Sequence, residues 1–322
     1  MITTKQYLQG VYGQLPVLCI SLVLLLGCKS DKKEENTEST MEEKSDPVIE
    51  IVTQVMDFQS VDTIPSGWNT FRYINKSNEP HFFLLDKYPE GKTIEDTEKE
   101  VMPAFNEGMD LINEGKSEEG FAAFNKLPAW FFDVVFTGGS GLVSPRHSST
   151  TTVYLEPGYY IMECYVKMSN GKFHSSMGMA KPIIITEESS KIQPPEATVL
   201  LSISSTEGIT YDGEIGKGPQ TFSVEFIDQI AHENFVGHDI NLVRWDENSD
   251  LDALDAWMNW ADPKGLINPA PEGFTFLGGV NEMPAGSKAY FKADLSPGTY
   301  AFVSEVPQPR SKNMLKTFVV SE

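Results

Sequence analysis

One cysteine stands at the end of a predicted strand and is followed along the chain by a histidine and a methionine. The strand begins at the Pro157-Gly158 turn and ends at Cys164, and a loop containing Asn170-Gly171 comes next. Nine residues separate Cys164 from His174, and four separate His174 from Met179. The run therefore offers a thiol, an imidazole and a thioether close together in the chain.

The strand that ends at Cys164 predicts where the thiol lies. Because side chains alternate between the two faces of a strand, Tyr160, Met162 and Cys164 share one face, which is apolar and expected to point inward. Burial alone raises the pKa of a thiol, so a thiolate at this position needs a metal to be stable. If the thiol stays protonated, Cys164 is an inert core residue.

The order of these residues resembles that of cupredoxins, in which one loop between two strands supplies a cysteine, a histidine and a methionine. In that family an upstream histidine completes a copper site, and His81 stands in the matching position. The long loop is more similar to the type-1 centres of two-domain copper nitrite reductases than to that of plastocyanin. Two imidazoles, a thiolate and a weak axial thioether suit copper. The resemblance implies one copper ion with four ligands: His81, Cys164, His174 and Met179, or Met177 as the alternative axial ligand.

Other interpretations of the same residues stay open. Taken one at a time, the cysteine and the methionines are typical of protein cores, and the histidines are typical of surface or hydrogen-bonded positions. Copper could serve electron transfer or copper handling, because a methionine cluster suits Cu(I); its members are Met162, Met168, Met177 and Met179. The alternative is a metal-free cupredoxin-like scaffold that acts as a surface binding or structural module, since a fold does not decide function.

The histidines favour an electron carrier or a binding protein over a catalyst. Nitrite reductases and multicopper oxidases need further copper ions held by extra histidines, but the five histidines of this chain include no His-x-His pair. Glu163 precedes Cys164 where nitrite reductases carry a histidine. Zinc-protease, phosphate-loop and nucleophile-elbow motifs are also missing. We therefore predict that the protein is not an enzyme.

The N-terminus predicts export and a lipid anchor. An apolar run from Leu15 to Leu26 ends in Gly27-Cys28, and this ending resembles the lipobox of bacterial lipoproteins. The resemblance implies that residues 1–27 are a signal peptide and that Cys28 carries lipid, which holds the protein at a membrane of the cell envelope without spanning it. Residues 28–48 are charged and nearly free of apolar side chains, so we expect a disordered tether. Cys164 is then the only thiol of the mature fold.

The charge of the chain excludes some partners. It has 25 basic and 46 acidic residues, a net charge of −21, which becomes −22 without residues 1–27. Such an acidic chain repels phosphates, so nucleic acid is not an expected partner. The expected partners are the membrane, through the lipid on Cys28, and a protein that exchanges electrons or copper.

Two halves of the chain resemble each other, which indicates an internal repeat. Phe136-Thr-Gly-Gly139 and Phe276-Leu-Gly-Gly279 lie 140 residues apart, and so do Leu155-Glu-Pro-Gly and Leu295-Ser-Pro-Gly. A polar segment with two prolines, residues 189–198, reads as a linker. We predict an all-β fold of two tandem Greek-key β-sandwiches resembling cupredoxins, residues 49–188 with the candidate copper site and residues 199–322 without it. Ser304 stands 140 residues after Cys164, at the position that the repeat gives to a second cysteine. His238 is therefore left without the other candidate ligands in the second half.

Short β-like segments and one helical insert are expected in each half. Thr93 and Ser249 are the expected helix caps, a Gly-Gly turn follows each insert, and the inserts are expected to cover one end of a sheet. The predicted strands are residues 70–74, 82–85, 149–155, 159–164 and 182–186 in the first half, and 221–226, 240–243 and 317–320 in the second.

Overall fold

Fifteen strands and a few short helices make up the part of the chain that the structure describes. The structure is a computed structural model that describes residues 47–322 except residue 247. The predicted signal peptide, Cys28 and all of the predicted tether but its last two residues lie outside the described residues. The strands of the first half are β1 (Val48–Thr53), β2 (Thr63–Asn75), β3 (Leu84–Lys87), β4 (Val135–Gly139), β5 (Ser148–Leu155), β6 (Gly158–Glu163) and β7 (Ala180–Ser189).

The second half has eight strands and one α-helix. Its strands are β8 (Val199–Ser204), β9 (Gly208–Asp212), β10 (Gly218–Phe226), β11 (Ile240–Trp245), β12 (Phe274–Val280), β13 (Lys288–Leu295), β14 (Gly298–Val303) and β15 (Leu315–Val320), and its helix is α4 (Leu251–Trp257). The insert of the first half holds α1 (Ile94–Asp96), a π-helical turn (Thr97–Val101), α2 (Met102–Asn113) and α3 (Ser117–Ala123).

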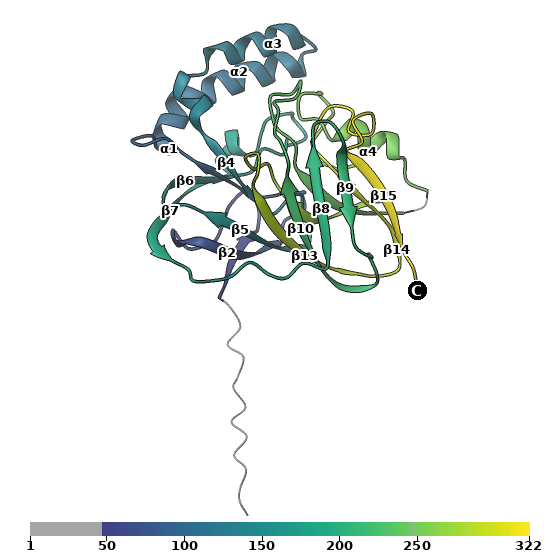
Figure 1. Ribbon diagram of the computed structural model, residues 1–322. Helices are drawn as coiled ribbons and strands as arrows, with labels where there is room; N and C mark the ends of the chain where they lie inside the picture. The colour runs from purple at the N-terminus through teal and green to yellow at the C-terminus, as the bar shows by residue number, and fades with distance from the viewer. Residues whose placement is uncertain (1–46, 247) are drawn as a thin grey trace, which may run out of the picture. The chain divides into compact units, whose positions relative to one another are not determined.

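The strands pack as layers in both halves (Figure 1). In the first half, β2 enters both layers, because residues 63–66 pair with β7 and residues 67–74 pair with β5. One layer holds β1, β2 and β5, and the other runs β4-β3-β6-β7. In the second half β13-β10-β8-β9 faces β12-β11-β14-β15. The predicted all-β sandwich fold with helical inserts is confirmed.

A strand pair joins sheets of the two halves, beside isolated bridges such as that between Val143 and Leu277. Thr150–Thr152 of β5 pair antiparallel with Tyr290–Lys292 of β13, so one layer of each half belongs to a single sheet. The described residues belong to one compact unit. The division into two domains at residues 189–198 stays a prediction.

The predicted strands lie close to the observed ones, with two corrections. The segment predicted at residues 82–85 begins two residues later, as β3. The Gly-Gly pairs are not turns but lie within β4 and β12. A side chain at Gly139 would place Cβ 1.8 Å from the carbonyl oxygen of Phe83, and one at Gly279 would lie 1.9 Å from that of Ile240. These glycines therefore allow neighbouring strands to approach closely.

One helix cap is confirmed and the other is wrong. Thr93 caps the insert in a capping box with Asp96, whose carboxylate accepts a hydrogen bond from the Thr93 backbone at 2.9 Å. In the second half the cap is Asp250 rather than Ser249. The Asp250 carboxylate accepts from the Asp252 backbone at 2.9 Å, because an acidic side chain at this position satisfies a free N–H of the first turn.

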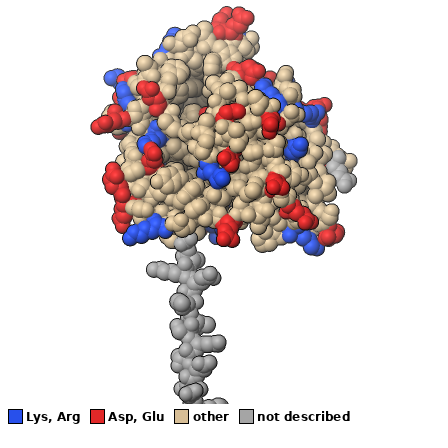
Figure 2. Space-filling view, in the orientation of Figure 1, with Lys and Arg blue, Asp and Glu red and all other residues tan. Residues whose placement is uncertain are grey.

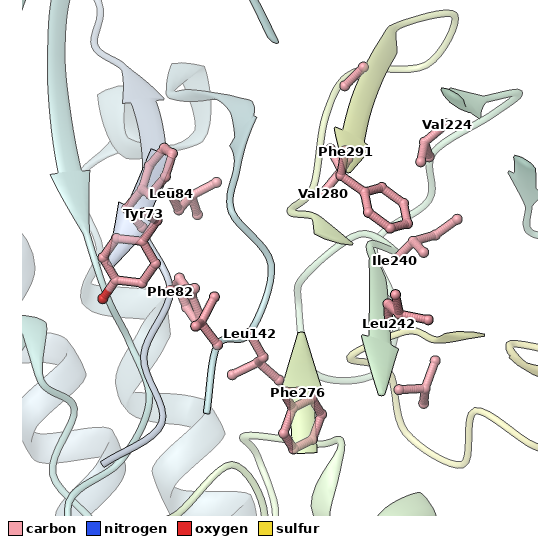
Figure 3. Packing of buried hydrophobic residues seen from close by; sticks show 14 of the residues in the cluster. Tyr73, Phe82, Leu84, Leu142, Val224, Ile240, Leu242, Phe276, Val280 and Phe291 are labelled. Carbon is pink, nitrogen blue, oxygen red and sulfur yellow. The ribbon is translucent and has the colours of Figure 1, made fainter. Parts of the chain in front are cut away.

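Buried apolar side chains from both halves form one cluster (Figure 3). In the first half Tyr73, Phe82 and Leu142 contribute to it, and in the second Phe276 and Phe291 do so. At the surface, acidic and basic side chains are interspersed over the face shown in Figure 2. Among the described residues, no helix combines the length and the apolar character needed to cross a membrane.

Candidate metal centre

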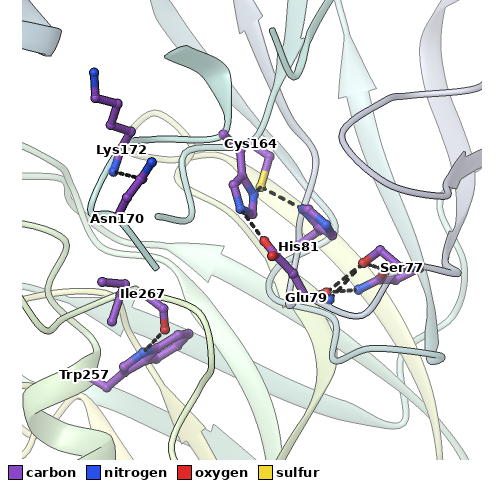
Figure 4. Close-up of polar contacts among 10 residues, drawn as sticks. Ser77, Glu79, His81, Cys164, Asn170, Lys172, Trp257 and Ile267 are labelled. Carbon is purple, nitrogen blue, oxygen red and sulfur yellow. Dashed lines mark hydrogen bonds and ion pairs between the residues drawn. The ribbon is translucent and has the colours of Figure 1, made fainter. Parts of the chain in front are cut away.

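Two histidines and the cysteine of the first half meet in the core (Figure 4). The Cys164 Sγ atom lies 3.7 Å from Nδ1 of His81 and 3.6 Å from Nδ1 of His174. All three side chains are fully buried, and their ligand atoms lie within 4.8 Å of one another. His81 lies 83 positions before Cys164 in the sequence, and His174 lies 10 positions after it. The fold therefore brings the three residues together.

Backbone hydrogen bonds hold each of the three residues in place. Cys164 directly follows β6, and its N–H donates to the Met179 carbonyl at 3.3 Å. His81 forms a bridge with Val143 in front of β3, which itself pairs with β6. The His174 N–H donates to the Val166 carbonyl at 2.9 Å, which folds the long loop back onto the strand end.

A carboxylate orients the imidazole of His174. The Glu79 Oε2 atom lies 3.0 Å from Nε2 of His174, so the ring donates this proton and keeps a lone pair on Nδ1, which faces the thiol. Metal-binding histidines commonly donate their second N–H to a carboxylate in this way. Glu79 was not among the predicted site residues, although its position two residues before His81 was a signal.

Both imidazoles are neutral at neutral pH. Burial lowers the pKa of His81 to about 4, an effect that the Val55 backbone carbonyl partly offsets. Burial, and then the neighbouring His81, lower the pKa of His174 to about 3. A neutral imidazole is the form that binds a metal ion. The Nε2 atom of His81 is buried and makes no hydrogen bond of standard geometry with the described residues.

The thiol is protonated when no cation is bound. Burial raises the pKa of Cys164 to about 12, and the backbone N–H groups of Phe82 and Val166 lower it in part. Those two N–H groups favour the thiolate, as do cations. A cation bound at this cluster would have to replace the thiol proton.

The donor separations fit a metal ion. Bonds of about 2.0 Å to imidazole nitrogen and 2.3 Å to sulfur, meeting at about 120°, place the two atoms roughly 3.7 Å apart. The Cys164 sulfur lies at this separation from both histidines. Two neutral imidazoles and a thiolate are the donor set of trigonal copper sites. The residues present therefore fit copper.

The two candidate axial methionines lie in different surroundings. Met179 is fully buried, and its carbonyl accepts from the Cys164 N–H, whereas Met177 is 52 % exposed. Met162 is also fully buried and Met168 is half-buried. The burial of Met179 beside Cys164 supports it over Met177 as the axial candidate.

Two further features near the site, a pair of buried carboxyl groups and a buried lysine, could not be predicted from residue type alone. Asp86 of β3 and Glu163 of β6 share a face of the sheet, and burial raises the pKa of both, to about 7 for Glu163. Lys167 is fully buried, where its Nζ donates to the carbonyls of Trp260 at 2.8 Å and Asp262 at 2.5 Å. This lysine ties the loop after Cys164 to the second half.

Comparisons with known proteins give remote structural likenesses. No family model and no curated protein matches the chain. Auracyanin A, a "blue" copper protein of Chloroflexus aurantiacus, is 19 % identical over 44 % of this chain and 98 % of that chain, with a TM-score of 0.27. The copper-containing nitrite reductase of Thermus scotoductus is 9 % identical over 85 % of this chain and 60 % of that chain, with a TM-score of 0.21. The blue copper oxidase of Nitrosomonas europaea is 12 % identical over 85 % of each chain, with a TM-score of 0.22.

These comparisons correct one prediction. The sequence favoured a carrier or binding protein over an enzyme. The similar structures, however, include a nitrite reductase and a blue copper oxidase as well as auracyanin. The prediction that the protein is not an enzyme is therefore contradicted.

Proposed function

We propose that the protein binds one copper ion at a cupredoxin-like site and uses it for electron transfer. The observation that carries the proposal is the position of Cys164 Sγ, which faces Nδ1 of His81 and of His174 at 3.7 and 3.6 Å. A thiol is only a weak hydrogen-bond donor and acceptor, so these two contacts contribute little as hydrogen bonds. With the thiol deprotonated, the same three atoms would supply the two imidazoles and the thiolate that copper sites use.

The residues around the proposed ligands have separate roles. His81, Cys164 and His174 would hold the ion, and Met179 is the proposed weak axial ligand. Glu79 fixes the ring of His174, and the strands β3 and β6 keep the ligands rigid. When bound, copper supplies a one-electron redox couple. Rigid burial suits electron transfer, because the ligands move little when the charge changes.

Several features of the sequence complete the proposal. Cys28 would carry lipid and residues 28–48 would connect it to the folded part, which places the protein at a membrane of the bacterial cell envelope. Residues 199–322 would be a second copy of the same fold that has lost its ligands. A redox protein of the envelope is the proposed partner, and a partner that exchanges copper is the second possibility.

Paired histidine variants test the site. In residues 46–322, we expect His174→Gln to lose the copper that the unchanged protein retains after desalting. His147→Gln is the matched control, because His147 is exposed and lies outside the cluster. Equal copper retention by both variants would contradict the proposal, and an unchanged circular dichroism spectrum would show that both variants are folded. A colourless Cu(I) complex would indicate copper handling instead of electron transfer.

A further inference from the structure

A cavity of about 440 Å³ lies between the helical insert and the sheet that carries Cys164. Its walls come from α2, α3, the β3-β6 face and the second half. Half of the lining residues are aromatic, and six of the rings are Phe105, Phe121, Phe124, Phe131, Phe173 and Trp260. The insert, which was expected only to cover the sheet, therefore encloses a space that fits a small organic molecule.

Two of the polar side chains at this cavity are buried and present acceptor oxygens. Asp86 is 3 % exposed and Asn234 is fully buried, and both line the cavity. Neither Oδ1 atom makes a hydrogen bond of standard geometry with the described residues, although the Asp86 carboxyl lies within hydrogen-bonding range of Glu163. The Asn234 amide donates from Nδ2 to Glu305 at 3.3 Å, which leaves its Oδ1 as the free acceptor. Buried oxygens without partners are rare and call for a donor.

The cavity carries no group that attracts an anion. Its lining within the described chain includes no lysine, arginine or histidine. It does include the carboxyl groups of Asp86 and Glu163, which share one face of the sheet. A ligand that fits must therefore be neutral or cationic, apolar over most of its surface, and able to donate hydrogen bonds.

The cavity lies on the other side of β6 from the metal cluster. Successive side chains of a strand point to opposite faces, so Glu163 faces the cavity while Cys164 faces the cluster. Ser175, next to His174, also lines the cavity. The two sites are therefore separate spaces that share one strand and one short helical turn.

We propose that this cavity binds a small planar aromatic molecule that carries a hydroxyl or amino group, with Asp86 and Asn234 accepting its hydrogen bonds. The aromatic walls contact the ring through offset and edge-to-face packing. The two acceptors select a donor-bearing compound over one of the same shape without a donor. The proposal does not rest on copper binding, so it is tested on metal-free protein.

A matched set of probes tests the inference by isothermal titration calorimetry on residues 46–322, which contain the whole buried cluster. The probes are 2-naphthol, 2-methoxynaphthalene, which has the shape without the donor, and 2-naphthoate, which is an anion. We expect 2-naphthol to bind at least tenfold more tightly than 2-methoxynaphthalene, because a buried hydrogen bond is lost. We expect no measurable binding of 2-naphthoate.

Variants then assign the contacts. Asp86→Leu and Asn234→Leu should each weaken 2-naphthol binding about tenfold and leave 2-methoxynaphthalene binding unchanged, which also shows that the cavity is folded. Val134→Trp, which fills the cavity, should abolish the binding of both probes. Asp110→Asn on the exposed side of α2 is the control and should change neither. Equal affinities for the two neutral probes would overturn the assigned hydrogen bonds, and absence of binding of all three probes would overturn the site.

Discussion

The same place in the two sandwiches carries different chemistry. His81 lies three residues before Leu84, which pairs with Glu163, and His238 lies three residues before Asn241, which pairs with Val303. The pairing register thus makes His238 the counterpart of His81. Ser304 follows β14 as Cys164 follows β6, and each donates its N–H to a methionine carbonyl, that of Met314 or Met179.

The equivalent position in the second half holds a network of hydrogen bonds around Asp239 and not a cysteine-histidine cluster. The Asp239 carboxylate accepts from Ser304 Oγ at 3.1 Å, from the Glu305 N–H at 2.6 Å and from Asn241 at 2.8 Å. The ring of His238 contacts His232 and the Asp228 carbonyl. One backbone arrangement therefore supports either a cysteine-histidine cluster or a polar hydrogen-bonded cluster, and a few side chains decide which.

The largest expected effect comes from making the first site like the second. We expect Cys164→Ser to reduce bound copper from one ion per chain to none, because the serine hydroxyl is a poor copper ligand. The reverse change, Ser304→Cys, should add no second ion, since Asp239 occupies that place and no histidine corresponds to His174. Metal analysis after desalting measures both. A second copper ion in the Ser304→Cys variant would show that the cysteine alone decides.

Removing the centre of the polar network should cost the fold more than removing the thiol. We expect Asp239→Ala to lower the free energy of unfolding by about 3 kcal/mol, because it leaves several buried donors without an acceptor. In metal-free protein Cys164→Ala should cost about 1 kcal/mol, since little but packing is lost. Urea unfolding measures both values. Equal losses of unfolding free energy in the two variants would contradict a structural role for the hydrogen-bond network around Asp239.

The carboxylate behind His174 should tune the first site. We expect Glu79→Leu to weaken copper binding about tenfold, because the ring of His174 loses its orienting acceptor. Glu79→Gln keeps an acceptor oxygen and should stay close to the unchanged protein. Competition with a chelator of known affinity gives the ratio. If both variants bind as the unchanged protein does, Glu79 has no positioning role.

A buried carboxyl of the second half should make stability depend on pH. Burial raises the pKa of Glu282 from 4.5 to about 7, so the folded chain keeps a proton that the unfolded chain loses. This contribution is complete below pH 4.5 and disappears as the pH rises through 7. Glu282→Gln retains an acceptor for the Gly237 N–H and should remove about 2 kcal/mol of that pH dependence. Urea unfolding at pH 5 and pH 8 gives the change in the free energy of unfolding between the two pH values. The same change in Glu282→Gln and in the unchanged protein would contradict the prediction.

Local patterns predicted the strands and the meeting of Cys164 with His174 well. The Pro-Gly turns and the alternation of residues 158–163 located β6, and the inward face of Tyr160, Met162 and Cys164 is fully buried as expected. The spacing of the loop indicated that Cys164 and His174 could meet. His81 could be placed only by the family resemblance, because its contact with Cys164 depends on strand pairing.

Long-range contacts were not predictable from these patterns. The pairing of β5 with β13, the burial of Lys167 and the cavity beneath the insert depend on how distant segments pack. The Gly-Gly pairs were interpreted as turns because glycine is typical of turns, yet Gly139 and Gly279 serve close strand contact. Asp250 and Ser249 are both good caps by type, so only the start of the helix could decide between them.

Copper loading of residues 46–322 tests the central claim most directly. The protein is incubated with Cu(II) and desalted, and its metal content and visible spectrum are recorded beside those of Cys164→Ser. We expect one copper per chain and an intense thiolate-to-copper band, both absent in the variant. Copper that is retained equally by the variant, or no retained copper in the unchanged protein, would contradict a copper site at His81, Cys164 and His174.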